Sequence, residues 1–558
     1  TLGGDEFAVL LPDLVDGDSA RAVAGRITDA VRAPIRLDGV PLALELAAAR
    51  GMSMSLADLL ASLRNHLEAL TEGLRVGVPR HRSARALIDW SFELLTDEER
   101  QVFVRLAAFM GSFDAIAVIA TCVDISTARA VSDILAGLVR KSLLIADTSG
   151  AVTRFRMLET VRQYGAAKLA ESSDAGSAKQ RHALYYYDIA LRVALAHGTD
   201  HQDLALRNLQ PDIPNLREAL EWSTSASHNV YLAAAIAAQL VEVWEARGEF
   251  VEAEHWLRRS LESETELLTL LTRAKLHEGL ALVTYRRGRL AETVSEATRA
   301  LESYALLDDA CGKLRARALL GLAAMGAAHI DTARDQFEAN LTEGRATNDL
   351  RAISASLNNL GRVFAEHEGR FDAAMPLFVE SLEAAWETRS LSQVLTALTN
   401  LSDCALGLKQ HAAGLTYARL GIAEAHKLGN REATADLALQ AVAHLLRSDG
   451  LAIAQDDAFA AWQAVGNVPF RPLIADRLDA VGLALHAAGQ PRRAAVLLGA
   501  TDAFRRRGEV LASFLSDERR RVTRKNISET LAPGEGEALY ARGASLGLQE
   551  AFREALLD

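Results

Sequence analysis

Hydrophobic residues recur at helical spacing along most of this chain. One early stretch shows the pattern well, with apolar residues at Leu87, Trp90, Leu94 and Leu95. Thr96 is followed three residues later by Glu99, which is the pattern of a capping box and marks the start of the next helix. A further helix is predicted to end near Lys141. Because each such pattern buries one face of a helix, the chain is predicted to be mainly α-helical.

Two short stretches depart from this helical pattern. SLLIAD (142–147) and VTRFRML (152–158) are typical of strands and flank a turn at Thr148, Ser149 and Gly150. Helices followed by a two-stranded hairpin form a winged-helix layout. We expect Trp90 and Tyr164 to be core aromatic residues of this domain rather than ligand platforms.

The second half of the chain repeats itself with a period near 40. Short turn phrases align in one column, whose members are Gly248, Gly288, Ala328, Gly369, Lys409, Asp449 and Gly489. Five residues further on, every position is small: Ala253, Thr293, Ala333, Ala374, Gly414, Ala454 and Ala494. A turn residue that ends one helix, followed by a small residue that lets the next helix pack closely, predicts roughly seven stacked helix pairs in a right-handed solenoid. The arrangement resembles tetratricopeptide-type repeats, and the long period implies longer helices or longer loops.

Composition and charge narrow the functional classes. The 558 residues are 49% hydrophobic and carry a net charge of −12, so there is no overall basic surface for non-specific binding to nucleic acid. Three widely spaced cysteines (Cys122, Cys311 and Cys404) are interpreted as reduced, buried thiols of a cytoplasmic protein. No apolar stretch approaches the length of a membrane span, and no secretory leader is visible.

The first residues, TLGGDEFAVLLPDL, contain two glycines and two carboxylates in a tight group. They resemble the signature hairpin of the diguanylate cyclases. The resemblance implies that Gly3 and Gly4 lie beside bound GTP and that Asp5 binds Mg²⁺. It ends near Pro34, and the family's second metal carboxylate and guanine-binding residues would precede Thr1. We therefore interpret the motif as vestigial, with Mg²⁺ and GTP expected only if missing upstream residues complete the domain.

A second resemblance begins at GVPLALELAAAR (39–50). This phrase is similar to the end of the nucleotide-binding (NB-ARC-like) module of bacterial STAND regulators. In that family its proline contacts adenine, so Pro41 inherits that role by resemblance; helix initiation is the alternative. The phosphate loop GxxxxGK[ST] occurs nowhere in the chain. No ATP hydrolysis is therefore expected, and ATP or ADP would bind only if a phosphate-loop module exists upstream. No cofactor is expected for this chain.

The same family resemblance extends through the winged helix and the repeats. It implies an intramolecular sensor role for the winged helix, rather than DNA contact. Arg140 and Lys141 end the would-be recognition helix, but base contact needs several polar residues near the start of that helix. The basic run DERRRVTRK (517–525) is interpreted as a solvated helix face. DNA contact is thus possible but not indicated.

These observations predict a mainly α fold with a small α/β fragment at the N-terminus, a winged helix and an α-solenoid of helix-pair repeats. The function expected is that of a regulatory scaffold of the STAND or LuxR type, not an enzyme, which binds a protein or peptide on the concave face of the solenoid. Self-association is left open. The alternatives are a diguanylate cyclase and a DNA-binding protein. The predicted segments are a cyclase fragment (1–35), a nucleotide-module remnant (36–78), the winged helix (79–172), connecting helices (173–232) and the solenoid with its cap (233–558).

Overall fold

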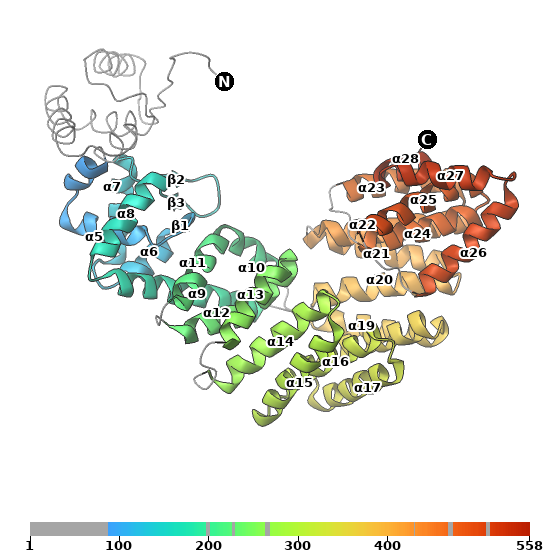
Figure 1. Ribbon diagram of the computed structural model, residues 1–558, viewed down its shortest axis with the longest axis horizontal. Helices are drawn as coiled ribbons and strands as arrows, with labels where there is room; N and C mark the ends of the chain where they lie inside the picture. Colours follow the sequence, from blue (N-terminus) through green and yellow to red (C-terminus); the bar gives the residue numbers. More distant parts are fainter. Residues whose placement is uncertain are drawn as a thin grey trace, which may run out of the picture. The chain divides into compact units, whose positions relative to one another are not determined.

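The computed structural model of the protein describes residues 88–196, 201–225, 229–262, 268–428, 430–466, 472–508 and 514–557. These residues are almost entirely helical, with one small sheet (Figure 1). The chain divides into two compact units, each with its own core. Unit 1 contains the described residues up to Leu191 together with Asn208–Ile236, and unit 2 contains Arg192–Arg207 together with Ala237 onward. The segment boundaries suggested by the sequence remain predictions.

The first part of unit 1 is a winged helix. Residues 88–93 are helical, and the elements that follow are α5 (Asp97–Leu106), β1 (Ser112–Asp114), α6 (Ala115–Cys122), α7 (Ala128–Arg140), β2 (Ile145–Asp147), β3 (Arg154–Arg156) and α8 (Glu159–Glu171). The three strands form an antiparallel sheet in the order β1-β3-β2, in which Phe155 pairs with both Phe113 and Ala146. This order places the β2–β3 hairpin beside the strand that precedes the helix-turn-helix pair α6–α7.

Local signals in the sequence account for these elements. The predicted capping box is present at α5, because the Thr96 hydroxyl accepts from the Glu99 amide while the Glu99 carboxylate accepts from the Thr96 amide. The helix predicted to end near Lys141 does so, and the two predicted strands flank the predicted turn. Trp90 and Tyr164 are buried core residues, as predicted.

The remaining helices of unit 1 hold the sheet in place. They follow the winged helix as α9 (Ala175–Ala196), α10 (Gln202–Leu209), η1 (Gln210–Asp212) and α11 (Ile213–Thr224), the last part of α9 and most of α10 being assigned to unit 2. Asn215 of α11 accepts from the Met110 amide and donates to the Ser112 carbonyl, at 2.7 and 2.8 Å. The edge strand β1 is therefore covered by a helix rather than left open.

Unit 2 is built from helix pairs. The pairs are α12 (Val230–Arg247, shared with unit 1) with α13 (Phe250–Glu262), α14 (Leu270–Arg286) with α15 (Leu290–Leu306), α16 (Ala310–Gly326) with α17 (Ile330–Thr347), α18 (Leu350–Arg362, continued by the π-helix η3, Val363–His367) with α19 (Phe371–Glu387), α20 (Leu391–Gly407) with α21 (His411–Leu428), α22 (Arg431–Ser448) with α23 (Leu451–Gly466), and α24 (Pro472–Ala487) with α25 (Pro491–Gly508). The seven predicted pairs are all present.

Longer helices explain the period of 40. Two helices of 17 residues, such as α14 and α15, alternate with turns of three residues. The single interval of 41 falls between Ala328 and Gly369, and the extra residue lies in the first helix of the fourth pair, which ends in η3. A π-helical turn is the usual way in which a helix absorbs one inserted residue.

The turn column has a conformational basis. In each of the seven pairs, the turn between the two helices contains one residue in the left-handed conformation, with φ between 59° and 82°. These residues are Gly248, Gly288, Ala328, Gly369, Lys409, Gly450 and Gly489. In the sixth pair, Asp449 is the turn residue that ends α22, as predicted, but it has φ −119°, and the next residue, Gly450, takes the left-handed conformation. A residue without a Cβ adopts that conformation at least cost.

The small-residue column is confirmed. All seven of its members are buried, each near the start of the second helix of its pair. At Gly414 the approach is so close that a Cβ would lie 2.0 Å from the His444 ring. The identity of these residues therefore sets how closely successive helices pack.

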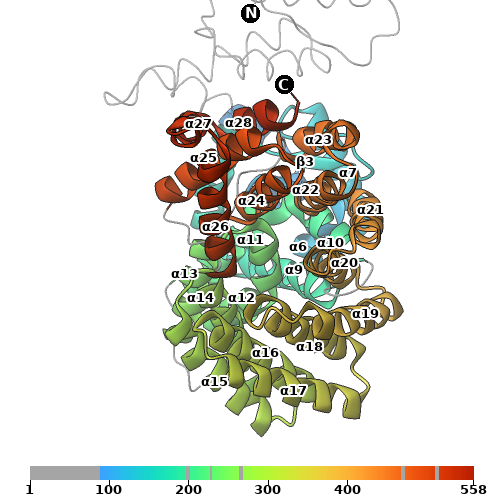
Figure 2. The same cartoon turned by 90° about the vertical axis from the view of Figure 1, so that its right-hand side faces the viewer.

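The pairs follow a curve, which Figure 2 shows for unit 2 from α14 through α19 to α22. The first helices, such as α16, α18, α20 and α22, lie on the inside of this curve, and the second helices lie on the outside. The array ends in α26 (Phe514–Thr530), α27 (Glu535–Ser545) and α28 (Leu548–Leu556), of which α27 and α28 pack on α25. Gly499 of α25 and Gly543 of α27 let these two backbones meet directly.

Two surface predictions need correction. The basic run 517–525 is not simply solvated, because Arg520 is mostly buried and pairs with Asp479 and Asp502, while the Arg524 guanidinium lies 4.7 Å from the centre of the Tyr540 ring. Cys122 and Cys404 are buried free thiols, as predicted, but Cys311 is exposed. Within the described ranges, every helix is too short or too polar to cross a membrane.

Candidate functional site

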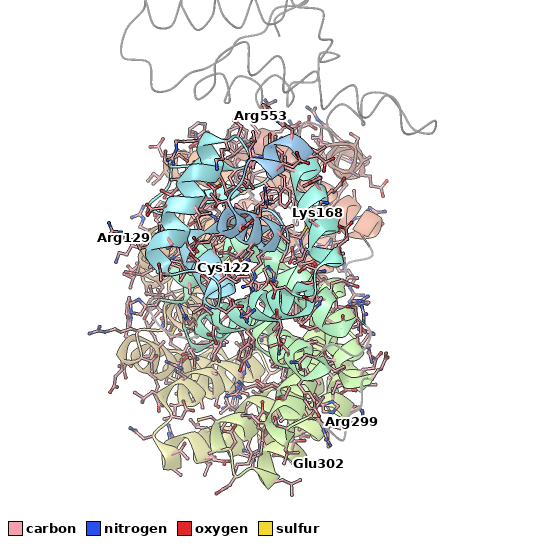
Figure 3. All side chains as sticks on the ribbon, turned by 90° about the vertical axis from the view of Figure 1, so that its left-hand side faces the viewer. Cys122, Arg129, Lys168, Arg299, Glu302 and Arg553 are labelled. Carbon is pink, nitrogen blue, oxygen red and sulfur yellow. The ribbon has the colours of Figure 1, made fainter. Side chains whose placement is uncertain are left out.

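The recognition helix of the winged helix is α7, whose apolar face is buried through Val131, Ile134, Leu135 and Leu138. Its outward face carries Arg129, Asp133 and Arg140, and Figure 3 shows Arg129 at the surface of this helix. Lys141 does not add to this face, since its Nζ lies 2.5 Å from both carboxylate oxygens of Glu99 on α5. Two cations and one anion remain, which is a weak electrostatic footprint for DNA.

Other cations of the winged helix are also used internally. Arg154 at the base of the wing lies 2.6 Å from Asp212, and it donates to the Ser112 carbonyl at 2.9 Å. Arg105 is buried and pairs with Asp124 and, at 2.6 Å, with Asp174. These ion pairs bind the winged helix to itself and to its flanking helices, so the guanidinium groups are not available to phosphates.

The inner face of the array is defined here as the surface of α14, α16, α18, α20, α22 and α24 that lies inside the curve. Charged residues collect on it at two equivalent positions, seven residues apart and hence on one side of each helix. In the order α14, α16, α18, α20, α22 and α24, the sixth residues are Lys275, Arg315, Ala355, Thr396, Asp436 and Arg477. In the same order, the thirteenth residues are Leu282, Leu322, Arg362, Asp403, Ala443 and Ala484. Glu242 takes the thirteenth position in α12.

Ion pairs join first helices along this face, both neighbouring helices and helices separated by another first helix. Arg286 lies 3.0 Å from Glu245, Arg315 lies 2.7 Å from Glu278, and Arg477 of α24 reaches Asp403 of α20 at 2.7 Å, across α22. Tyr285 of α14 likewise interacts with Arg362 at the end of α18.

Two carboxylates of this face, Glu242 and Asp403, are strongly desolvated although each side chain is partly exposed to water. Burial, together with repulsion from Glu245 and Glu278, raises the pKa of Glu242 to about 8. Burial also raises the pKa of Asp403, against the lowering effect of Arg477, although 35% of that side chain is exposed. A carboxylate that is accessible yet poorly hydrated lies in a recess, which is the environment in which an added charge is felt most strongly.

A hollow lies on the outer side of the array. It measures about 610 Å³ and is lined by residues of α19, among them Met375, Pro376 and Val379, and by Leu408 and Gln410 of the turn before α21. The described residues hold no group of three or more histidine, cysteine or acidic side chains arranged to bind a metal.

The residues assigned to nucleotide and metal chemistry from the sequence are Gly3, Gly4, Asp5 and Pro41. All four lie outside the described residues, so their roles remain predictions. The structure instead brings together inner-face charges that the sequence interpretation passed over. Their signal was present as charged residues recurring at intervals of 40 or 41, for example at Lys275, Arg315, Asp436 and Arg477.

Comparison with known proteins finds one matching domain model and several relatives in sequence. A family model described as "Winged helix-turn-helix domain" matches residues 95–170. A protein of Mycobacterium tuberculosis named "Putative HTH-type transcriptional regulator" is 40% identical over 231 residues, which is 41% of this chain and 26% of that protein. An uncharacterized protein of the same organism is 36% identical over 150 residues, or 26% of this chain and 38% of that protein. The chain thus spans about a quarter of the length of the regulator it matches.

Two solved structures are similar to this chain at low sequence identity. A STAND protein with a tetratricopeptide repeat sensor from Pyrococcus horikoshii is 14% identical, with a TM-score of 0.46 over 87% of this chain and 75% of that chain. The quorum sensor NprR from B. thuringiensis is 13% identical, with a TM-score of 0.43 over 60% of this chain and 88% of that chain. The described residues combine a domain that matches the winged helix-turn-helix model with a solenoid of helix pairs, and the sequence relatives include a protein named as a transcriptional regulator.

Proposed function

We propose that this chain is the sensory part of a transcriptional regulator, in which the inner face of the helical array binds a protein or peptide partner. The observation that carries the proposal is the row of recessed charged side chains along the first helices. Its ion pairs, such as Arg315 with Glu278 and Arg477 with Asp403, keep part of their charged groups exposed, and 35% of the Asp403 side chain is accessible. Groups held in this way favour a polar partner that follows the curve and replaces lost hydration with hydrogen bonds. The sequence relatives supply the regulatory context.

The winged helix is proposed to contact protein rather than DNA. Arg105, Lys141 and Arg154 are committed to internal ion pairs. Family resemblance suggests the same role, in which a winged helix relays the state of a neighbouring module. No cofactor is proposed for this part of the regulator.

The test is a selection of random dodecapeptides displayed on phage against the intact chain. Selected peptides are then mapped by hydrogen exchange. Protection that appears in first helices such as α16, α18, α20 and α22 supports the proposal. Absence of any selected binder, or protection confined to second helices such as α17 and α19, contradicts it.

DNA binding is the second candidate, because the matched domain is of the helix-turn-helix class and α7 exposes Arg129 and Arg140. It predicts binding to a 30-base-pair duplex that weakens steeply as salt rises and that is lost in the Arg129→Ala, Arg140→Ala double variant. Fluorescence anisotropy at low salt measures both effects. Binding that is absent, or that survives the double variant, removes this candidate.

A further inference from the structure

The outer hollow beside α19 brings apolar side chains and negative charge together. Besides the apolar residues of α19 and Leu408, its lining includes three carboxylates, those of Asp372, Glu380 and Glu383. The described residues that line it include no lysine, arginine or histidine. Its volume of about 610 Å³ lies within the range of roughly 300–1,000 Å³ that is typical of ligand pockets. A molecule bound there would meet an apolar surface and negative charge at the same place.

Two of these carboxylates have no partner within the described part of the chain. Glu380 is compensated, because Arg345 of α17 donates to it at 2.5 Å. Asp372 and Glu383 are exposed, and neither side chain forms a hydrogen bond or ion pair with another described residue. A basic group placed beside either of them would gain an ion pair without breaking one in the protein.

Pro376 leaves a further acceptor unpaired next to Asp372. It lies inside α19 and has no amide hydrogen, so it cannot donate to the carbonyl of Asp372, four residues earlier. An unpaired carbonyl favours a partner that carries N–H donors, as the two free carboxylates do. Lysine and arginine side chains carry only donors, so they fit all three acceptors.

These groups lie on one side of α19. Val379 follows Asp372 by seven residues and Glu383 follows Val379 by four, which places the three side chains along one face of the helix. Trp386 continues this face one turn later, and it is 38% exposed. The two free carboxylates are eleven residues apart, or about 16 Å along the helix axis. The face thus presents an apolar stretch between two negative charges, with a tryptophan beyond them.

The repeat itself does not require an apolar surface here. The preceding second helix, α17, carries Arg334, Asp335 and Glu338 where α19 has the three apolar residues of the hollow. Its counterpart of Trp386 is Arg345. Charged side chains are usual on a solvated helix face, whereas an exposed tryptophan among apolar neighbours is typical of a protein contact. The face of α19 therefore differs from that of α17 in the way expected of a docking surface.

We propose that the outer face of α19 binds a segment of a protein partner in which a large apolar side chain lies between two basic residues. The apolar side chain enters the hollow, and the basic residues pair with Asp372 and Glu383. Charge complementarity selects this partner, because the described lining offers free carboxylates and no cation. Two charges about 16 Å apart, with an apolar surface between them, match a polypeptide better than a single small cation. The inner face belongs to the first helices, so this site is separate from that of the proposed function.

The test selects random dodecapeptides displayed on phage for binding to the intact chain. Phage that also bind the double variant Asp372→Lys, Glu383→Lys are removed first. Both proteins have the same inner face, so this step removes the binders of that face. The peptides that remain are expected to share a large apolar residue flanked by lysine or arginine, and to protect α19 from hydrogen exchange.

Affinities of the synthetic peptides then separate a local contact from a general effect of charge. Binding to the double variant should be at least tenfold weaker than binding to the wild type. Replacement of either basic residue of the peptide by glutamine should weaken binding at least threefold. The matched control is Glu302→Lys, Asp456→Lys, which makes the same change of net charge at exposed residues of α15 and α23. It is expected to leave the affinity unchanged.

Val379→Glu tests the apolar contact. Glutamate is already present at the equivalent position of α17, so the variant is expected to fold, which circular dichroism verifies. It should weaken binding at least tenfold, whereas Val294→Glu on α15, at a residue that is 44% exposed, should not. If Val379→Glu fails to fold, Trp386→Ala takes its place and should weaken binding at least threefold.

Three results would overturn the site itself: the loss of all peptides in the subtraction, binding that does not depend on the basic residues of the peptide, and equal weakening in the control variants. Octylamine that displaces the peptides with similar affinity would overturn the assignment of a polypeptide. A concentration-dependent dimer in sedimentation velocity that is lost in Val379→Glu would assign the face to a second copy of the chain instead. Protection of the first helices remains the separate test of the proposed function, so the two proposals can fail independently.

Discussion

Glycine and phenylalanine are matched between the two helices of a pair. Gly321 of α16 faces Phe337 of α17, and a Cβ on the glycine would lie 2.5 Å from the ring. The next pair repeats this match with Gly361 and Phe378. Where the second helix instead carries a small residue, Ala297, the facing position in α14 is Ala281 and both are fully buried. A phenylalanine on the second helix of a pair therefore requires glycine at the facing position of the first helix.

Gly321→Ala is expected to lower the free energy of unfolding by about 1–3 kcal/mol, because overpacking outweighs a helix-propensity gain of about 1 kcal/mol. Phe337→Leu in the same chain should recover part of the loss, so the double-mutant cycle has a coupling energy of about 1 kcal/mol or more. Urea unfolding measures all three variants. Gly344→Ala is the control, since its Cβ would lie 3.4 Å from its nearest neighbours, and additive effects of the cycle pair would disprove the match.

Two buried histidines predict a loss of stability in acid. Burial lowers the pKa of His182 in unit 1 and of His444 in unit 2 to about 4 in each case. The unfolded chain takes up these protons near pH 6.5, whereas the folded chain does not until pH 4. Stability is therefore lost as pH falls from about 6.5 to about 4, by up to about 3 kcal/mol for each histidine.

Urea midpoints between pH 7 and pH 4.5 measure this dependence. His444→Gln is expected to be less stable than the wild type at pH 7, because it disturbs the contact of the ring with Ser402, but to lose less stability on acidification. A variant whose midpoint falls as steeply as that of the wild type would show that His444 is not responsible.

At the scale of the element, the left-handed turns predict different effects of substitution at neighbouring residues. Gly450→Ala forces an alanine to φ 82° and should cost about 1–2 kcal/mol, although nothing lies within 4 Å of the added Cβ. Asp449→Ala is expected to have little effect. In the fifth pair, Lys409 already stands at φ 59°, so Lys409→Gly should raise stability by about 0.5–1 kcal/mol. Thermal melts that show equal losses for Asp449 and Gly450 would contradict the assignment of the turn.

Elements were predictable from the sequence where their signals are local. The capping box at Thr96 and Glu99, the strand residues around Gly150 and the turn glycines every 40 residues each act within a few positions of the chain. The shift from Asp449 to Gly450 was missed because an alignment of equal periods cannot show that α22 is one residue longer.

The candidate site was less predictable because its partners are distant in sequence. Arg477 and Asp403 are 74 residues apart, and Asp479 and Asp502 approach Arg520 from helices that precede it. A basic run flanked by acids therefore looks solvated in sequence when one of its arginines is in fact buried. The periodic columns predict which residues share a face, but the curvature of the array decides which of them meet.

At the scale of the whole molecule, two cores predict two unfolding transitions. Leu106 of α5 is buried in unit 1, and Leu398 of α20 is buried in unit 2. Each leucine-to-alanine change should cost about 2–5 kcal/mol, but only in its own unit, because the side chains belong to different cores. Hydrogen exchange in increasing urea distinguishes them, since peptides from α5–α8 report one unit and peptides from α18–α21 report the other.

Leu106→Ala should therefore lower the urea midpoint for peptides of the winged helix and leave that of the array peptides in place, and Leu398→Ala should do the reverse. If either substitution shifts both midpoints equally, the two units unfold as one. Within unit 2, each pair contacts mainly its neighbours, so the loss at Leu398 should be largest in α20 and the adjoining helices and should fade toward α14. A uniform loss across unit 2 would mean that the array unfolds as a single cooperative block. In that case an event at the inner face would be transmitted along all of its helices.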